Sequence, residues 1–263
     1  MIAVAERHSL AATLGRISAL DEYLTIELGT GGGDGWVPAT ELRAALPAIL
    51  RRVGEDAGTD DVRIEAALFL WGYAWKVAAP PIACYLVERR VPDVGPENVA
   101  LRIDDRGGVS ELALRSARFA EVAGGPADDA DLLGWLRERL ESHLAVVVGA
   151  VRACSPLGRR APWALAADAC ADAFLHVGRK LGREQESCRE AELFLAPRPG
   201  SRLRSRARFF TLEHAGRRET FLRRASCCLY YKVPAGAYCA TCPLLPEPER
   251  ERRLLADLER FAG

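Results

Sequence analysis

Four cysteines near the C-terminus constrain this chain more than any other feature of its 263 residues. Cys227, Cys228, Cys239 and Cys242 follow the pattern C-C-x10-C-x2-C. A C-x2-C pair suits metal chelation, because a tight turn directs both thiolates to one point. The four thiols match the ligand count of a tetrahedral zinc site and of a two-iron, two-sulfide cluster. The sequence therefore predicts that this segment folds around a metal centre.

The adjacent cysteines favour one of these two kinds of site but do not decide between them. Neighbouring side chains on a strand point to opposite faces, so Cys227 and Cys228 need a local bend to reach one centre. Structural zinc sites usually space each ligand pair by two to four residues, and this pair does not. Pro243 repeats the Cys-Pro ending of one ferredoxin ligand run, and the small residues of 234–237 would let backbone N–H groups approach a cluster. The spacing favours a cluster, and zinc stays open as the alternative.

Composition and charge narrow the class of protein. Hydrophobic residues make up 49% of the chain, so it can bury a core. The formal net charge is zero, whereas a dedicated nucleic-acid binder is usually basic. The N-terminus lacks a signal-peptide pattern, and the apolar run 66–87 contains Lys76 and Pro80-Pro81, which oppose membrane insertion. We expect a soluble, cytoplasmic protein, in which cysteines stay reduced.

Residue patterns predict an α+β fold that is mainly helical. Two buried helices are expected to meet at Pro80-Pro81, and residues 98–103 and 109–114 read as an antiparallel β-hairpin around Asp-Asp-Arg-Gly-Gly. From about residue 191 to the cysteines the pattern predicts strands, at 202–212 and 219–233, joined by a turn at His214-Ala215-Gly216. Capping residues and apolar periodicity predict helices at about 41–53, 62–79, 81–90, 131–153, 162–182 and 247–261.

Charge is distributed unevenly along the chain. Residues 198–242 carry nine arginines and one lysine against two glutamates, a net charge of +8. We therefore divide the chain into a helix-rich body, residues 1–197, and a basic β-hairpin with a cysteine-rich segment, residues 198–263. The second part has few apolar anchors, so we expect it to depend on the body. Within it Arg202, Arg204, Arg206 and Arg208 alternate, which is typical either of an exposed docking surface or of an ordinary solvent-facing strand.

No nucleotide-binding fingerprint accompanies these features. Residues 29–35 are rich in glycine, but their spacing does not fit the dinucleotide-binding pattern, and a linker is the simpler interpretation. We therefore do not expect the chain to bind its own nicotinamide cofactor.

Side chains beside the cysteines are candidates for binding a substrate. They are Arg224, Tyr230, Tyr231 and Lys232, with core packing as the alternative role for a tyrosine and solvation for the charges.

Side chains inside the predicted helices have simpler structural roles. We expect two histidines, His143 and His176, to pack rather than to bind a ligand. The four further cysteines should act as small hydrophobic residues; they are Cys84, Cys154, Cys170 and Cys188. At least one of three aromatic residues should belong to the core; they are Trp71, Tyr73 and Trp75.

The residues around the cysteines resemble those of a known family. Cys227-Cys228-Leu-Tyr-Tyr and Cys239-Ala-Thr-Cys242-Pro-Leu are similar to the C-terminal motif of the FhuF-like ferric-siderophore reductases, and looser similarity extends over about residues 60–245. The resemblance implies a [2Fe-2S] cluster bound by these four cysteines. It also implies one-electron reduction of a bound Fe(III)-siderophore in the cytoplasm, with release of Fe(II), and it implies no further catalytic residue.

The expected partners follow from this resemblance and, for the electron donor, from the missing nucleotide-binding fingerprint. They are a ferric siderophore, of the hydroxamate type, and a separate electron donor such as a ferredoxin, a flavodoxin or an NAD(P)H-dependent reductase. Neither a nucleic acid nor a membrane is expected as a partner. The alternative function is a non-catalytic module that binds a siderophore or a protein and contains a structural zinc site with four cysteine ligands.

Overall fold

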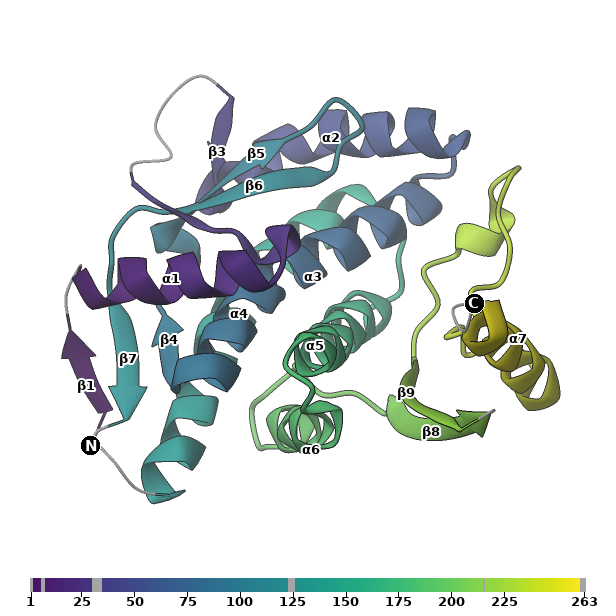
Figure 1. Cartoon of the computed structure of the whole chain (residues 1–263). Helices are drawn as coiled ribbons and strands as arrows, with labels where there is room; N and C mark the ends of the chain where they lie inside the picture. The colour runs from purple at the N-terminus through teal and green to yellow at the C-terminus, as the bar shows by residue number, and fades with distance from the viewer. Residues whose placement is uncertain (1, 6–7, 30–34, 123–125, 215, 261–263) are drawn as a thin grey trace.

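A computed structural model describes residues 2–5, 8–29, 35–122, 126–214 and 216–260 of the chain (Figure 1). Helices dominate, and three small sheets accompany them, so the expected α+β fold is confirmed. The α-helices are α1 (His8–Leu20), α2 (Leu42–Ala57), α3 (Val62–Glu88), α4 (Pro126–Cys154), α5 (Ala161–Lys180), α6 (Glu184–Leu195) and α7 (Glu247–Arg260).

Helix α3 is the centre of the body. It contacts α1, α2, α4 and α5, and α5 lies between it and α6 (Figure 1). Asp61 caps its N-terminus, because the Asp61 carboxylate accepts a 2.9 Å hydrogen bond from the backbone N–H of Arg63. Most of its side chains are buried, which explains why its sequence is apolar on all sides.

The expectation of two helices meeting at Pro80-Pro81 is wrong, because α3 continues through both prolines. An internal proline costs about 3 kcal/mol through a lost hydrogen bond and a steric clash. The residues that follow, including Ile82, Tyr85 and Leu86, are nearly inaccessible to solvent. Burial of each large apolar side chain contributes about 1.5–3 kcal/mol, so packing of the second half of α3 outweighs the cost of the prolines.

Two sheets flank the helical body. The first has the strand order β1-β7-β4 and the second β2-β6-β5-β3. Strands β5 and β6 form the predicted hairpin, with Val99 opposite Leu114 and Leu101 opposite Leu112. The strands are β1 (Ile2–Ala5), β2 (Glu27–Leu28), β3 (Trp36–Pro38), β4 (Arg90–Pro92), β5 (Val99–Ile103), β6 (Val109–Leu114) and β7 (Phe119–Val122).

The region between α5 and the cysteines departs from the expected strands. Residues 184–195 form α6, and residues 201–207 run along the body as extended chain without a strand partner. The third sheet is a hairpin of β8 (Arg208–His214) and β9 (Arg217–Arg223), and β9 ends well before residue 233. The turn predicted at His214-Ala215-Gly216 includes Ala215, which lies outside the described residues, as do residues 30–34 of the predicted glycine-rich linker.

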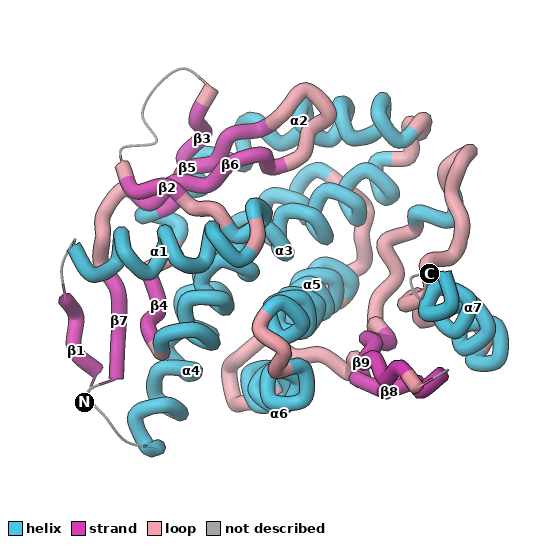
Figure 2. The backbone as a smooth tube through the Cα atoms, viewed as in Figure 1, coloured by secondary structure: helices cyan, strands magenta, loops and turns pink. Residues whose placement is uncertain are grey.

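Residues that follow β9 form mainly loop, up to α7 (Figure 2). A short 3-10 helix, η4 (Tyr230–Lys232), interrupts this loop. The loop therefore has few backbone hydrogen bonds of its own and must be held by contacts with neighbouring elements.

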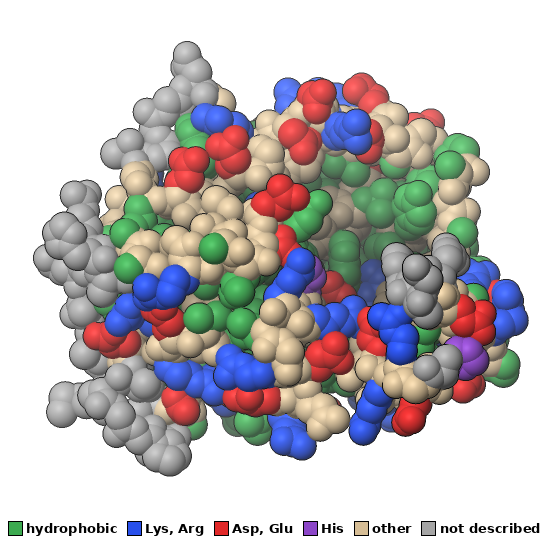
Figure 3. All heavy atoms as spheres, viewed as in Figure 1, with side chains coloured by type: hydrophobic (Ala, Val, Ile, Leu, Met, Phe, Trp, Pro, Cys, Tyr) green, Lys and Arg blue, Asp and Glu red, His purple; other side chains and the backbone are tan. Residues whose placement is uncertain are grey.

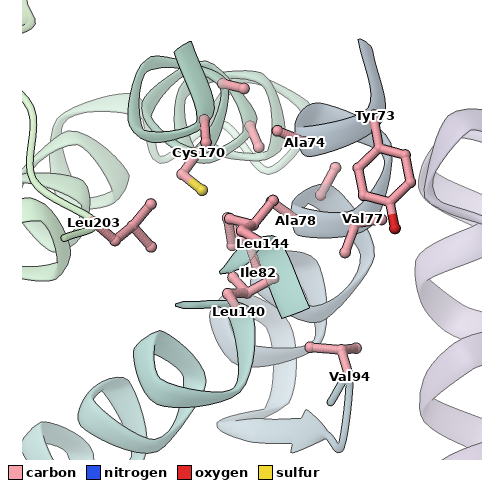
Figure 4. Packing of buried hydrophobic residues seen from close by; sticks show 14 of the residues in the cluster. Tyr73, Ala74, Val77, Ala78, Ile82, Val94, Leu140, Leu144, Cys170 and Leu203 are labelled. Carbon is pink, nitrogen blue, oxygen red and sulfur yellow. The ribbon is translucent and has the colours of Figure 1, made fainter. Parts of the chain in front are cut away.

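One hydrophobic core joins these parts. Tyr73, Leu140, Leu144 and Cys170 converge in it, and Leu203 from the extended segment packs into the same core (Figure 4). Cys84, Cys170 and Cys188 are buried and Cys154 is half-buried, and all four are free thiols. Across the described parts of the chain, no helix combines the length and the apolar character needed to cross a membrane.

Candidate metal centre

The four cysteines of the motif lie in the loop between β9 and α7, as two pairs. The sulfur atoms of Cys227 and Cys242 are 3.8 Å apart. The sulfur atoms of Cys228 and Cys239 both face Arg224, whose Nη2 lies 3.7 Å from the first and 2.6 Å from the second. The loop therefore brings together side chains that are up to 15 residues apart in the sequence.

The backbone supplies the bend that the adjacent cysteines require. Leu229, directly after them, has a φ of 63°, in the left-handed region that non-glycine residues rarely adopt. This conformation lets the backbone N–H of Leu229 approach the sulfur of Cys227, at 3.4 Å. A strained residue of this kind costs about 1–2 kcal/mol, so the surrounding contacts must hold it in place.

Gly236 closes the loop for a steric reason. A Cβ at this position would lie 1.9 Å from the carbonyl oxygen of Tyr230, so only glycine fits. The backbone N–H of Gly236 donates to the carbonyl oxygen of Val233. It is therefore already engaged within the loop, in contrast to the expectation that N–H groups of residues 234–237 would face a cluster.

Asp168 of α5 anchors the loop, and the sequence analysis did not single it out. Its Oδ2 accepts hydrogen bonds from the backbone N–H groups of Ala225 and Ser226, at 2.8 and 2.7 Å, and from the hydroxyl of Ser226, at 2.6 Å. Its Oδ1 accepts from the hydroxyl of Ser205, at 2.5 Å. Burial raises the pKa of Asp168, while its hydrogen bonds act in the opposite direction. The one signal in the sequence is an isolated acid within the apolar stretch 165–171 of a helix.

Arg250 of α7 anchors the other end of the loop and was also not predicted. Its side chain is 1% exposed, and its Nη2 donates to the carbonyl oxygens of Cys242 and Leu245, at 2.9 and 2.6 Å. The backbone N–H of Cys242 donates to the carbonyl oxygen of Cys239, which forms the tight turn expected of the C-x2-C pair. Helices α5 and α7 therefore hold the first and the last ligand candidates in place.

The arrangement fits a two-iron centre better than a single ion. Two thiolates on one tetrahedral metal with bonds of about 2.3 Å would lie about 3.8 Å apart, as Cys227 and Cys242 do. Within the described residues, no three Cys, His, Asp or Glu side chains converge on one ion position. The contact between Cys227 and Cys242 matches the two sulfurs that one iron of a two-iron centre would receive. Burial raises the pKa of Cys227 to about 11, so metal binding must displace its proton.

A cavity of about 550 Å³ lies on one side of the cysteine loop. It is bounded by α2, α3, the turn between β5 and β6, and Tyr230, Val233 and Ala235 of the loop. The surface is visibly hollowed and lined with hydrophobic side chains beside the C-terminal segment (Figure 3). Its polar lining residues are Asp56, Asp104, Arg106 and Tyr230. A volume of this size is typical of small-molecule sites.

The candidate substrate-binding residues have different surroundings. Tyr230 is exposed and lines the cavity. Tyr231 and Lys232 do not line it; Tyr231 stacks on Tyr238, with ring centroids 4.5 Å apart. Arg224 is 5% exposed and faces sulfur atoms rather than the cavity.

The three aromatic residues of α3 have separate roles. Tyr73 is 2% exposed and belongs to the core, as expected for at least one of them. The ring of Trp71 lies 4.5 Å from the guanidinium of Arg224, and the indole N–H of Trp75 donates to the half-buried Asp172 carboxylate.

Both helical histidines pack as expected. His143 is fully buried between the Tyr73 hydroxyl and the Val94 carbonyl oxygen, and burial lowers its pKa to about 4. His176 packs edge-on against Trp75 and pairs with Asp21 at 2.9 Å.

The alternating arginines are exposed, as predicted, although Arg208 alone of the four belongs to a strand. Leu203, between the first two, is fully buried, and Ser205, between the next two, bonds to Asp168. One carboxylate therefore connects the basic segment to the cysteine loop.

Comparison with protein families gives two matches. A model described as a ferric iron reductase FhuF-like transporter matches residues 67–219. A second, described as a FhuF 2Fe-2S C-terminal domain, matches residues 224–244. The second match covers all four motif cysteines and favours the iron–sulfur centre over the zinc alternative. A search of curated proteins found no significant match.

Proposed function

This chain belongs to the family of FhuF-like ferric iron reductases, with a [2Fe-2S] cluster as its cofactor, and from that premise we propose that its substrate is a ferric siderophore held beside the cysteine loop. Cys227, Cys228, Cys239 and Cys242 are the proposed ligands of the cluster. The single observation that carries the proposal is the cavity of about 550 Å³ that the same loop lines through Tyr230.

Reduction explains how such a protein would release iron. Siderophores hold Fe(III) with hard oxygen donors. One added electron lowers the charge of the ion and softens it, so those donors bind it less tightly. When bound by the four cysteines, the cluster would supply a one-electron carrier in the loop that also lines the cavity. Each turnover takes one electron from a donor and converts one Fe(III) to Fe(II), without any covalent bond to the protein. The chain needs to hold the complex and to exclude other acceptors.

The lining of the cavity supports a hydroxamate complex. Asp56 and Asp104 contribute two carboxylates and Arg106 one guanidinium. Arg106 lies 3.6 Å from Asp56, and Asp104 accepts backbone hydrogen bonds from Arg106 and Gly108. This lining would repel a highly anionic catecholate complex and would admit a neutral or cationic hydroxamate complex.

Blocking the cavity tests this proposal. Gly72 lines it on the exposed side of α3, and a Cβ there would meet no atom within 4 Å. We expect Gly72→Trp to raise the KM for a ferric hydroxamate at least tenfold, while the visible spectrum of the cluster stays the same. Gly149→Trp is the matched control, because Gly149 on α4 is equally unobstructed and lies outside the cavity lining. Equal KM values for both variants would place the substrate elsewhere.

The electron donor in this proposal is a separate acidic redox protein, such as a ferredoxin or flavodoxin, that docks on the arginines of residues 202–208. Arg204 and Arg206 are exposed, and within the described residues neither has an ion-pair partner. Ser205 between them is bonded to the carboxylate that also holds Ser226, next to Cys227. A donor on this surface would therefore lie close to the cysteine loop.

Charge reversal tests the docking surface. We expect the double variant Arg204→Glu/Arg206→Glu to slow reduction of the cluster by reduced ferredoxin about tenfold at low salt and to flatten its salt dependence. Reduction by methyl viologen radical, which needs no docking, should not change. Arg43→Glu/Arg52→Glu on α2 is the charge-matched control, since both arginines are exposed. Equal rates for the two double variants would exclude this surface.

Two further parts of the proposal concern organisation and location. We propose that residues 1–197 act as the substrate-binding body and residues 198–263 as the electron-transfer segment. A cytoplasmic location would keep all eight free thiols reduced.

A further inference from the structure

Arg224 places a buried positive charge directly against two of the proposed ligand sulfurs. Its Nη2 lies 2.6 Å from the sulfur of Cys239 and 3.7 Å from that of Cys228. We propose that Arg224 raises the reduction potential of the cluster by donating a charged N–H group to this pair of sulfurs. The inference rests on the cysteine ligands proposed above, and it assigns to Arg224 a tuning role instead of substrate binding.

The surroundings hold the guanidinium in this position. Its plane lies over the ring of Trp71, with the central carbon 4.5 Å from the ring centroid. The backbone N–H of Arg224 donates to the carbonyl oxygen of Thr241, which fixes the residue to the C-x2-C turn. With the side chain 5% exposed, little water can compete for its donors. The guanidinium is therefore preorganised toward the sulfurs before any electron arrives.

Among the described residues, no carboxylate contacts the guanidinium of Arg224 directly, and the buried Asp168 acts on it only from a greater distance. In the part of the chain that the structure describes, no carboxylate oxygen lies within ion-pair distance of its guanidinium, and its Nε has no hydrogen-bond partner. The neighbouring Arg223 differs, because it is half-exposed and lies 2.8 Å from Glu247. A partnered, hydrated charge is largely screened, whereas an unpaired buried charge acts strongly on nearby atoms.

The sign of the effect follows from the charges. Reduction adds one negative charge to the cluster, and N–H donors and positive charge near its sulfurs stabilise the reduced form. Arg224 therefore makes the cluster easier to reduce. Because arginine stays protonated at all working pH values, this contribution is independent of pH.

A redox titration of the intact, cluster-loaded protein tests the inference, with the electron paramagnetic resonance signal of the reduced form as readout. We expect Arg224→Gln to lower the equilibrium constant for reduction at least tenfold, which corresponds to a fall of about 59 mV in midpoint potential. Arg224→Lys keeps the charge but loses the planar, stacked donor, so its potential should fall by a smaller amount. Arg223→Gln is the matched control and should titrate as the native protein does.

Trp71→Leu separates tuning from simple folding. It leaves Arg224 in the chain but removes the ring that positions it, so we expect a partial fall in potential. Unchanged potentials in the Arg224 variants would overturn the inference while leaving the reductase proposal intact. Loss of iron from all three of Arg224→Gln, Arg224→Lys and Trp71→Leu would also overturn it, because Arg224 would then be a structural clamp. A native protein that takes up no cluster would instead refute the proposed function.

Discussion

The helical body and the cysteine loop are stabilised by different kinds of contact. Helix α5 is buried through apolar side chains such as Leu165, Phe174 and Val177. The cysteine loop, which lies against it, is held by Asp168 and Arg250, whose charged groups bond to backbone atoms of the loop. Truncation of a core side chain lowers the stability of the whole body, whereas loss of a charged anchor affects mainly the loop that this anchor holds. The body therefore presents one anchor of the metal centre, Asp168, and α7 presents the other, Arg250.

A substitution in the core should affect the whole chain most. Phe194 of α6 is fully buried, and its ring lies 5.3 Å from that of Phe174. We expect Phe194→Ala to lower the free energy of unfolding by about 4 kcal/mol, as measured by urea denaturation. The variant that still folds should bind iron as the native protein does. A variant that folds but has lost most of its iron would contradict a loop that depends mainly on its polar anchors.

Loss of the α5 anchor should affect the cysteine loop and its iron more than the stability of the body. Asp168→Asn removes the negative charge, so the hydrogen bonds from the backbone N–H groups of Ala225 and Ser226 and from the Ser226 hydroxyl are no longer charge-assisted. At roughly 1 kcal/mol for each of three buried donors, we expect about 3 kcal/mol of local destabilisation. Limited proteolysis should cut after residue 200, and iron content should fall severalfold.

Asp105→Asn, in an exposed turn, is the control for this variant. If Asp168→Asn retained its iron and resisted protease like the control, the anchor would be dispensable.

A buried histidine of the body should also make the stability of the chain depend on pH. His143 has a pKa of about 4 in the folded chain, lowered by burial, against about 6.5 in the unfolded chain. Between these values only the unfolded chain binds the proton, so stability is complete above pH 6.5 and is lost as the pH falls toward 4. The loss reaches about 2 kcal/mol at pH 5.

Urea titrations at several pH values check this dependence. His143→Gln should flatten the slope between pH 6.5 and 5, and His214→Gln, at a half-exposed histidine, should not. Equal slopes in the native protein and His143→Gln would mean that folding does not lower the pKa of His143.

The α7 anchor should have the smallest effect. Arg250→Met keeps the length of the buried side chain but removes its hydrogen bonds to the carbonyl oxygens of Cys242 and Leu245. We expect a loss of roughly 1–2 kcal/mol and faster release of iron to a chelator. Arg252→Met, on the exposed side of the same helix, is the control. Identical release rates would show that the C-x2-C turn needs no support from α7.

The same contrast explains what the sequence could predict. Helix periodicity located α4 and α5, and the turn sequence located the β5–β6 hairpin, because these signals are local. The cysteine pattern is local as well, and it pointed to the segment that the 2Fe-2S family model matches. Asp168 and Arg250 escaped prediction because the partners of Asp168 are nearly 60 residues away along the chain and those of Arg250 are backbone atoms, which leave no residue signature.

Errors in the predicted elements arise where tertiary packing overrides local preference. Pro80-Pro81 is a helix-breaking signal, but burial of the residues after it keeps α3 continuous. Alternating arginines at 202–208 suggested a strand, but the backbone there bonds to Arg137 and Glu141 of α4 instead of to a second strand.

The most direct test of the account is a single-turnover reaction without oxygen. The protein, with its cluster reduced and the excess reductant removed, is mixed with a ferric hydroxamate, and Fe(II) is captured by a coloured chelator while the paramagnetic signal of the reduced cluster is followed. We predict that one Fe(II) appears for each reduced cluster, at the rate at which the signal disappears, and that Gly72→Trp slows both together. A signal that persists in the presence of the ferric complex, or Fe(II) that forms equally fast in the Cys242→Ser variant, would contradict electron transfer through this site.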